Sequence, residues 1–423
     1  MRKIRTAPIV AFLLIFLSAD AQTYVSGGIF TSTVWTLAGS PYIITDDVVV
    51  FDDLVLSIEP GVVIQVHPDK RIELRNSRLV AIGTEAQGIL FTCTDASSTW
   101  QGIVPLGLVT VYSGNQMHLE YCTIEKANIG VDFDDAYHTP YEFLHCEFRD
   151  CTAGVQDADI DFHYGYYLFQ DCYFHDNVTG INQGLQTVIG SRFENNGTGA
   201  RTYHLEGCTL TGNSVLAASA PRMIGCIVRE NNIGYDGGLA NGWIIDNNVV
   251  VGNNIGFRMA GFFTDYGSFA NNVICRNSLY NIQRVSWGSN EAAHIQGTCF
   301  CTDDEATVEA SIHDAVDDIS VGWIDYLPLN TEPWCVNFHI GIPEPDPEAV
   351  SLTPNPSSGY VMLQGKDLDR IMILDIGGRS VIERSFSRRS NFELNVHELP
   401  SGTYFVRAMQ GDRWSVSKLI KVD

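Results

Sequence analysis

The sequence predicts an all-β chain: a right-handed parallel β-helix of roughly twelve coils followed by a small C-terminal β-sandwich. The main observation is a twelve-residue phrase that recurs eight times, with 17 to 26 residues between starts. Self-similarity at a period of about twenty residues is typical of a solenoid, in which no repeat buries its apolar face alone. The copies begin at Cys122, Cys146, Cys172, Ser191, Cys208, Cys226, Asn248 and Asn272.

Each copy contains one short strand and one bend. Positions one and three are apolar or small, whereas positions two and four are polar or variable, so one face of the strand is buried. Position six is usually Asn, as at Asn196 and Asn213, and we expect each such Asn to bond to its equivalent in the next coil. Position one is Cys in five copies, which predicts a file of small buried thiols, with disulfides between neighbouring coils as the alternative in an exported chain.

The N-terminus has the features of a Sec-type signal peptide over residues 1–21. Arg2, Lys3 and Arg5 precede an apolar run, 9–17, and the segment 19–21 has the A-x-A form of a cleavage site. The run is too short to span a bilayer, which disfavours the alternative of a retained anchor. The exported protein is therefore expected to begin near Gln22 and to have no transmembrane segment.

The body is predicted to be a β-helix with end caps over residues 22–340. Residues 42–121 fit earlier, irregular coils and resemble the opening coils of secreted parallel β-helix proteins of the pectin-lyase-like kind. We expect residues 22–41 to cover the first coil and 303–335 to cover the last, with a short helix over 309–316. The resemblance is carried by Ile58, Pro60, Gly61, Ile64, Leu79, Gly83, Thr84, Phe91, Thr92, Trp100 and Gly102.

A Pro-rich linker, 341–350, precedes a separate module at 351–423. Alternating strands with turn Gly and Pro predict a compact β module, for which an immunoglobulin-like binding domain is the alternative. Its landmarks resemble the type A C-terminal sorting domain of the type IX secretion system of Bacteroidetes. That resemblance implies export by this machinery, followed by release or attachment to the outer cell surface. The landmark residues are Pro354, Asn355, Pro356, Gly359, Gly378, Gly402, Tyr404 and Lys418.

The charge of the chain excludes some partners. The formal net charge is −24, and residues 22–349 alone contain 13 Lys and Arg against 41 Asp and Glu. Such an acidic body repels nucleic acid and anionic membranes. It also repels polyuronates unless divalent cations bridge the two.

The acidic inserts between coils are the candidate chemical sites. Asp157, Asp159 and Asp161 alternate along an extended stretch, which would place them on one face, and His163 follows as a possible base. Such a cluster suits calcium, or paired acids for glycoside hydrolysis. A solvated acidic loop face is the alternative, because like charges repel when no fixed cation holds them.

Aromatic side chains accompany these acids, as sugar-ring stacking requires. Local packing of the loops is the alternative. We interpret the following residues as a candidate binding surface for extracellular polysaccharide: Asp132, Asp134, Tyr137, Tyr164, Tyr166 and Trp243.

Cys299 and Cys301, with Cys335 and His339, have a spacing that a zinc site does not favour, so a disulfide in the C-terminal cap is expected instead. Two functions follow from the whole sequence. The first is an exported binding or structural protein that recognises glycans. The second is a carbohydrate-active enzyme, a polysaccharide lyase or glycoside hydrolase. The scarcity of Lys and Arg near the coil exits weakens the lyase interpretation, so we favour binding.

Overall fold

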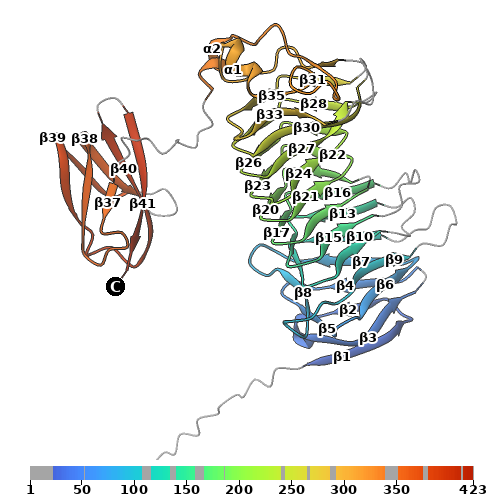
Figure 1. Cartoon of the computed structure of the whole chain (residues 1–423). Helices are drawn as coiled ribbons and strands as arrows, with labels where there is room; N and C mark the ends of the chain where they lie inside the picture. The colour runs from blue at the N-terminus through green and yellow to red at the C-terminus, as the bar shows by residue number, and fades with distance from the viewer. Residues whose placement is uncertain are drawn as a thin grey trace, which may run out of the picture. The chain divides into compact units, whose positions relative to one another are not determined.

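The computed structural model describes residues 22–51, 53–106, 116–133, 140–157, 166–184, 186–239, 243–263, 267–285, 292–338, 351–374, 380–410 and 413–422. The chain divides into two compact units between Asn337 and Phe338. In the first unit the strands of successive coils stack one above the next, as the run of colours from blue to orange in Figure 1 shows. Every strand pair in the two long sheets is parallel, so this unit is a parallel β-helix.

One wall of the β-helix is an eleven-stranded sheet, with one strand from each coil. This number agrees with the roughly twelve coils predicted. Its strands are β2 (Thr33–Trp35), β4 (Val55–Ile58), β7 (Arg78–Ile82), β10 (Gln116–Glu120), β13 (Pro140–Leu144), β16 (Tyr166–Gln170), β19 (Thr187–Ile189), β22 (His204–Glu206), β25 (Arg222–Ile224), β28 (Ile244–Asp246) and β31 (Ser268–Ala270).

The other wall is a 23-stranded sheet that runs in two rows. β1 (Thr23–Ile29) and β3 (Tyr42–Val50) are long enough to contribute to both rows. Row 1 continues with β5 (Val63–Val66), β8 (Ile89–Cys93), β11 (Cys122–Glu125), β14 (Glu147–Arg149), β17 (Tyr173–His175), β20 (Arg192–Glu194), β23 (Thr209–Thr211), β26 (Ile227–Arg229), β29 (Val249–Val251) and β32 (Val273–Cys275). Row 2 continues with β6 (Arg71–Arg75), β9 (Gly102–Leu106), β12 (Ile129–Asp132), β15 (Ala153–Gln156), β18 (Thr179–Asn182), β21 (Thr198–Arg201), β24 (Leu216–Ser219), β27 (Ile233–Leu239), β30 (Ile255–Phe263), β33 (Tyr280–Arg284) and β35 (Ile312–His313).

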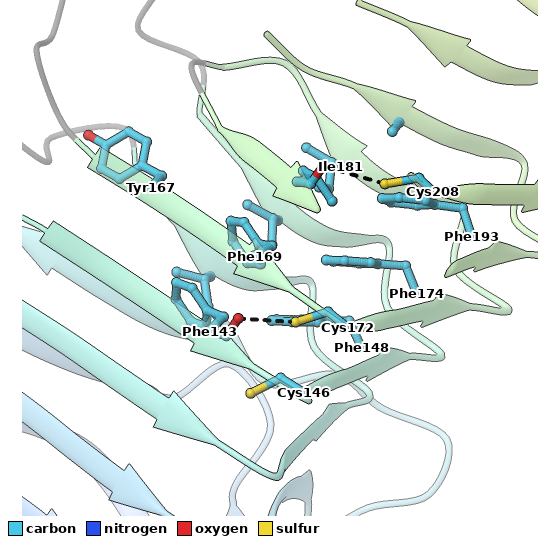
Figure 2. Close-up of a cluster of buried hydrophobic side chains, with 14 of the residues drawn as sticks. Phe143, Cys146, Phe148, Tyr167, Phe169, Cys172, Phe174, Ile181, Phe193 and Cys208 are labelled. Carbon is cyan, nitrogen blue, oxygen red and sulfur yellow. Dashed lines mark hydrogen bonds between the residues drawn. The ribbon is translucent and has the colours of Figure 1, made fainter. Parts of the chain in front are cut away.

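The interior is built from files of equivalent side chains. Phe148, Phe174 and Phe193 occupy position three of successive copies and are fully buried. Their rings stack nearly parallel, with centroids 4.7 and 4.8 Å apart (Figure 2). Offset stacking at this spacing adds about 0.5–1.5 kcal/mol per pair beyond the burial of the rings. The prediction that like side chains lie over like is confirmed.

The file at position one contains thiols, as expected. Cys122, Cys146, Cys172, Cys208 and Cys226 are buried and free, and the alternative of disulfides between these coils is wrong. Each sulfur lies 3.3–3.5 Å from backbone carbonyl oxygens, as Cys172 does from that of Phe143 (Figure 2). A thiol is small enough to fill this narrow position and weakly polar enough to face a carbonyl.

The Asn at position six forms the predicted ladder. The side-chain amide of Asn196 donates to Oδ1 of Asn213 at 3.1 Å, and that of Asn213 donates to Oδ1 of Asn231 at 2.8 Å. Each amide also donates to a backbone carbonyl, as Asn213 does to Phe193 at 3.2 Å. Buried polar groups in a solenoid corner need such partners, and the ladder supplies them from coil to coil. Its members are Asn177, Asn196, Asn213, Asn231, Asn253 and Asn277, and it continues to Asn281.

Two left-handed residues turn each of the eight repeated coils. One immediately precedes position one, as at Asp171 (φ 53°), and the other is position five, as at Asp176 (φ 55°). Asn, Asp and Gly adopt this conformation at low cost, and they fill many of these sites. The constant spacing within each copy therefore reflects two fixed bends, of which the sequence pattern predicted only one.

The two ends of the β-helix differ. Residues 22–41 were expected to cover the first coil, but they form it: β1 pairs with β3, β2 pairs with β4, and a short 3-10 helix, η1 (Leu37–Gly39), lies between β2 and β3. At the other end a cap contains β34 (Ala293–His294), β36 (Ile324–Asp325), α1 (Glu305–Glu309) and α2 (Pro333–Val336).

The helix predicted at 309–316 lies earlier, at Glu305–Glu309. Asp304 caps it by accepting a hydrogen bond from the backbone N–H of Thr307 at 3.3 Å. The residues after it cannot continue the helix because Ile312 pairs with Ile282 in row 2. Disulfides Cys275–Cys301 and Cys299–Cys335 fasten the cap, which confirms the expected cap disulfide in place of zinc, although the predicted set of cysteines did not include Cys275.

The second unit is a small antiparallel β module. Its strands are β37 (Ser351–Thr353), β38 (Tyr360–Leu374), β39 (Ser380–Asn395), β40 (Gly402–Gln410) and β41 (Arg413–Lys421). Both halves of β38 pair with β39. On its other side the first half pairs with β37, and the second half, after a register change between Gln364 and Leu368, pairs with β40. The core of this unit includes Val361, Leu363, Ile371, Ile373, Val406 and Leu419.

Candidate functional site

The structure describes only some of the predicted site residues. Asp134, Tyr137, Asp159, Asp161, His163, Tyr164 and Gly378 lie outside the described residues. So does the linker 341–350, with His339 before it. The calcium site predicted at Asp157, Asp159 and Asp161 therefore stays a prediction. Among the residues that are described, no group of three or more His, Cys, Asp or Glu is arranged to hold a metal ion.

Asp132 and Asp157 do not point the same way. Asp132 lies beside Gln156 in the register of β12 and β15, so both side chains face outward. Asp157 is one residue further along and only 2% exposed, packed against Gly184, where any larger side chain would collide with its carboxylate. Alternation along the strand thus places the two carboxylates on opposite faces of the wall.

The predicted aromatic residues are also separated. Tyr166 begins β16, directly after one of the acidic inserts, with its backbone paired to Pro140. Trp243 is half-buried and directly precedes β28. The two strands are four places apart in the eleven-stranded sheet, which is about 19 Å at ordinary strand spacing. A short glycan segment could therefore contact both Tyr166 and Trp243 only if it lay across the strands, parallel to the axis of the β-helix.

A shallow hollow of about 210 Å³ lies on the outer face of the eleven-stranded sheet, where β7, β10 and β13 run side by side. Nδ1 of His118 lies 2.9 Å from Oε2 of Glu142, which is next to it in register. Both side chains remain accessible, with 33% of His118 and 47% of Glu142 exposed. The hollow is lined by Arg78, Leu79, Val80, Gln116, Met117, His118 and Glu142.

Sequence reasoning found the inserts but missed this hollow. The predicted acidic insert that contains Asp134 precedes β13 in the chain, so the hollow lies partly on a strand that follows one of the predicted inserts. The available signal was the alternation Gln116, His118, Glu120, which places three polar side chains on the outer face.

A second polar surface, which we call the charged array, lies on row 1. It consists of Glu125, Glu147, Arg149, Tyr173, His175, Arg192 and Glu194. Arg149 donates to Glu125 at 2.6 Å, and Thr92 donates to the other oxygen of Glu125 at 2.7 Å. Glu147 lies 2.8 Å from Nε2 of His175 and 3.5 Å from Arg149, so it joins adjacent coils.

The array continues to a fourth strand, β20. The hydroxyl of Tyr173 and the guanidinium of Arg192 both donate to the same oxygen of Glu194, each at 2.7 Å. Arg192 lies 4.5 Å above the ring of Tyr173, which stacks on His175 with centroids 4.1 Å apart. Cross-strand pairs of this kind stabilise a sheet and hold the side chains in fixed positions.

Mutual contacts set the protonation of the array. Burial lowers the pKa of His175, but its hydrogen bonds with Asp176 and Glu147 outweigh burial and the pKa is raised. Burial raises the pKa of Glu125, but the bonds from Thr92 and Arg149 outweigh it and the pKa is lowered. Burial and the bond to Glu194 raise the pKa of Tyr173 to about 12. At neutral pH the array therefore holds a carboxylate, a protonated phenol and an imidazole biased toward the cation.

The landmark residues of the second unit have structural roles. Oδ1 of Asn355 accepts a hydrogen bond from the backbone N–H of Ile420 at 2.8 Å, which ties the segment of Pro354 and Pro356 to the last strand. Gly359 accepts from the backbone N–H of Val396 at 2.8 Å.

The end of the module is held in the same way. The hydroxyl of Tyr404 donates to the carbonyl of Pro400 at 2.8 Å, in the manner of a tyrosine corner. Gly402 begins β40 opposite Lys421, and Lys418 pairs with Phe405 in the same ladder. The landmarks thus fix the ends of the strands.

Comparison with known proteins identifies the second unit. Residues 351–422 match the family model of the secretion system C-terminal sorting domain. No curated protein matches the chain significantly. Among solved structures, a mutant of a periplasmic alginate epimerase is similar, with 13% sequence identity, 65% of this chain and 69% of that chain covered, and a TM-score of 0.21.

The assignment of the first unit as a parallel β-helix depends on its strand pairing alone, since a TM-score of 0.21 does not support an argument about the fold. No helix among the described residues is long and apolar enough to cross a membrane. The chain therefore consists of a parallel β-helix joined to a type IX secretion system C-terminal sorting domain, which directs it to the cell surface or the extracellular space.

Proposed function

We propose that the protein is an extracellular or cell-surface glycan-binding protein, with the hollow on β7, β10 and β13 as its binding site. The observation that supports this most directly is the composition of the hollow. Arg78, Gln116, His118 and Glu142 offer donors and acceptors beside the half-buried apolar side chain of Val80, while Leu79 and Met117 lie beneath in the core. Sugar rings present hydroxyl groups at their edges and CH groups on their faces, so a mixed surface of this kind suits them.

The charge of the body favours neutral glycans. Residues 22–349, with 13 Lys and Arg against 41 Asp and Glu, repel polyuronates, and in the hollow Glu142 offsets the positive charge of Arg78. The predicted binding residues of the acidic inserts, Asp134 and Tyr137, directly precede β13 in the chain, which agrees with this location. The sorting domain places the β-helix outside the cell, where such polymers are found.

Binding is tested on a glycan array that includes neutral polysaccharides and alginate as a polyuronate comparator. We expect binding to a neutral glycan, about tenfold weaker in His118→Ala, which removes a hydrogen-bonding group, and in Glu142→Gln, which replaces one acceptor oxygen with a donor, since each lost bond is worth about 1–1.5 kcal/mol. Glu206→Gln is the matched control, because Glu206 is an outward carboxylate of the same sheet outside the hollow and is 52% exposed. Equal losses in Glu142→Gln and Glu206→Gln would place the site elsewhere.

The alternative is a carbohydrate-active enzyme. Within the charged array, Glu147 and His175 are the candidates for an acid–base pair, with Oε1 of Glu147 2.8 Å from Nε2 of His175. His175 is only 13% exposed and is held on its other side by Asp176 at 2.6 Å, so both ring nitrogens are engaged. This mutual satisfaction favours a structural role and supports binding over catalysis. Depolymerisation of the bound glycan by the wild type, abolished in His175→Gln, would reverse that preference.

A further inference from the structure

The first coil leaves a sheet edge open. Within the described residues, β1 pairs only with β3, and β2 pairs only with β4. Thr23 donates to the carbonyl of Pro41 at 3.0 Å, and the carbonyl of Ile29 accepts from Phe51 at 3.4 Å. Because peptide groups alternate in direction along a strand, those of Tyr24 and Gly28 face away from β3. A register shift between Val25 and Gly27 divides this edge into two short segments.

The apolar core is also incomplete at this end. Val25 and Ile29 lie in register over Ile44 and Val50, which are 0% exposed, yet Val25 and Ile29 themselves remain partly exposed. Four large apolar side chains of the same coil are exposed outright: Tyr24 at 65%, Phe30 at 73%, Val34 at 55% and Leu37 at 47%. At the opposite end, the cap with its disulfide Cys299–Cys335 covers the last strands of the 23-stranded sheet, where Ile274 and Ile282 are 0% exposed.

The charge pattern distinguishes this coil from the rest of the body. Residues 22–45 contain no Asp, Glu, Lys, Arg or His, although the chain has 50 Asp and Glu. Proteins usually protect an open edge strand with charged side chains, because an unprotected edge recruits another strand. The first coil is thus the part of an acidic molecule that a second acidic molecule can approach with the least repulsion.

We propose that the first coil is a self-association surface, and that two copies of the chain join first coil to first coil about a twofold axis. This arrangement sets the open edge of β1 antiparallel to the same edge of its partner, so each unpaired segment meets its own complement. It also covers Val25, Ile29 and the exposed apolar side chains of both copies. Head-to-tail stacking is disfavoured because the cap closes the other end of the β-helix.

The proposal is tested by sedimentation velocity on residues 22–423, which include every described residue. We expect a dimer at micromolar protein that persists or strengthens as salt is raised, because the contact is apolar and uncharged and salt screens repulsion between the acidic bodies. Val34→Lys should weaken the dimer at least about tenfold, because the twofold axis brings two like charges to one interface. Tyr24→Pro removes the backbone N–H of residue 24, which faces away from β3 and would bond to the partner copy. Because proline is tolerated on an edge strand, the β-helix should keep its fold while the dimer weakens by a similar factor.

Two control variants make the result specific. Val178→Lys changes an apolar side chain that is 66% exposed in the middle of the stack, and should leave the dimer intact. Ile319→Lys changes a side chain of the cap that is 96% exposed, and should also leave it intact. A monomer at all concentrations, or a dimer broken only by Ile319→Lys, would overturn the proposal. Far-ultraviolet circular dichroism confirms that each variant keeps its β structure.

Discussion

Replacing one member of the Asn ladder tests how far the buried hydrogen bonds hold the coils together. Asn213 is 0% exposed and lies mid-stack. Its Oδ1 accepts from both the backbone N–H and the side-chain amide of Asn196, each at 3.1 Å. Its own amide donates to Phe193, Thr211 and Asn231 at 3.2, 3.3 and 2.8 Å. Asn213→Ala removes all five bonds.

The expected cost follows from the groups left without a partner. The backbone N–H of Asn196 loses its acceptor, while the side-chain amide of Asn196 keeps one bond, to Phe174 at 3.0 Å. Oδ1 of Asn231 still accepts from the backbone N–H of Asn213 at 2.8 Å. The backbone N–H of Asn196 and one of the two N–H groups of its side chain are thus left without an acceptor. At about 1–3 kcal/mol each, they predict a loss of about 3 kcal/mol in the free energy of unfolding.

Guanidinium denaturation followed by circular dichroism measures this loss, compared at equal m-values. Asn254→Ala is the matched control, because Asn254 bonds its neighbour Asn232 at 3.2 Å but is exposed, and it should cost under about 0.5 kcal/mol. Hydrogen exchange should also show lost protection at the Asn196 amide. A cost for Asn213→Ala below about 1 kcal/mol, or equal to that of the control, would refute the reasoning.

Three further predictions concern other contacts. His175→Gln should lower the melting temperature more at pH 5.5 than at pH 8.5. The pKa of His175 is raised above the ordinary 6.5, so the protonated ring stabilises the fold at low pH, and this stabilisation is lost as pH rises through the folded-state pKa. Equal losses of melting temperature at both pH values would contradict this. Cys146→Ser should cost under about 1.5 kcal/mol by thermal unfolding, because Ser191 already occupies the equivalent position and donates to the carbonyl of Ile189 at 3.1 Å. Cys146→Leu should cost about 1–3 kcal/mol, because the larger side chain overpacks the file. A larger cost for Cys146→Ser than for Cys146→Leu would show that the file is not narrow. Joint replacement of Cys299 and Cys335 by Ala should destabilise the cap by about 3–4 kcal/mol, given the 36-residue separation of the two cysteines. Hydrogen exchange should become faster in 292–337 but not in the coils in the middle of the stack. An equal increase in exchange across the whole β-helix would show that the cap does not unfold independently.

Much of the β-helix could be predicted because each position of the repeat has one physical requirement, such as burial or a bend, that recurs in every copy. Alternation fixed the buried positions, and the recurrent Asn fixed a bend that needs a polar partner in the next coil. Position five was not predictable in the same way, because its left-handed residues include Lys126, Glu230 and Arg276 as well as Gly252. The backbone requirement there is satisfied by several residue types, so composition gives no consistent signal.

The candidate site was harder to predict than the fold. Acidic and aromatic residues located the inserts, but their sequence has no period from which side-chain directions could be derived. Asp157 illustrates the difficulty: alternation extended past the end of β15 places it inside the wall, 2% exposed, instead of beside Asp132. The hollow at His118 and Glu142 arises from register between strands 24 residues apart, which the repeat boundaries at Cys122 and Cys146 imply only indirectly.

The register of the phenylalanine file has a consequence for how such a chain can diversify. Phe148 and Phe174 are 26 residues apart and Phe174 and Phe193 only 19, yet the ring spacing is nearly identical. The difference in length between these two coils therefore lies mainly in the segments outside the strands, and the stacking distance of the buried rings does not change. An evolving lineage can lengthen, shorten or exchange one outer segment at a time while the scaffold beneath stays unchanged, which makes the molecule a natural acceptor for grafted recognition loops.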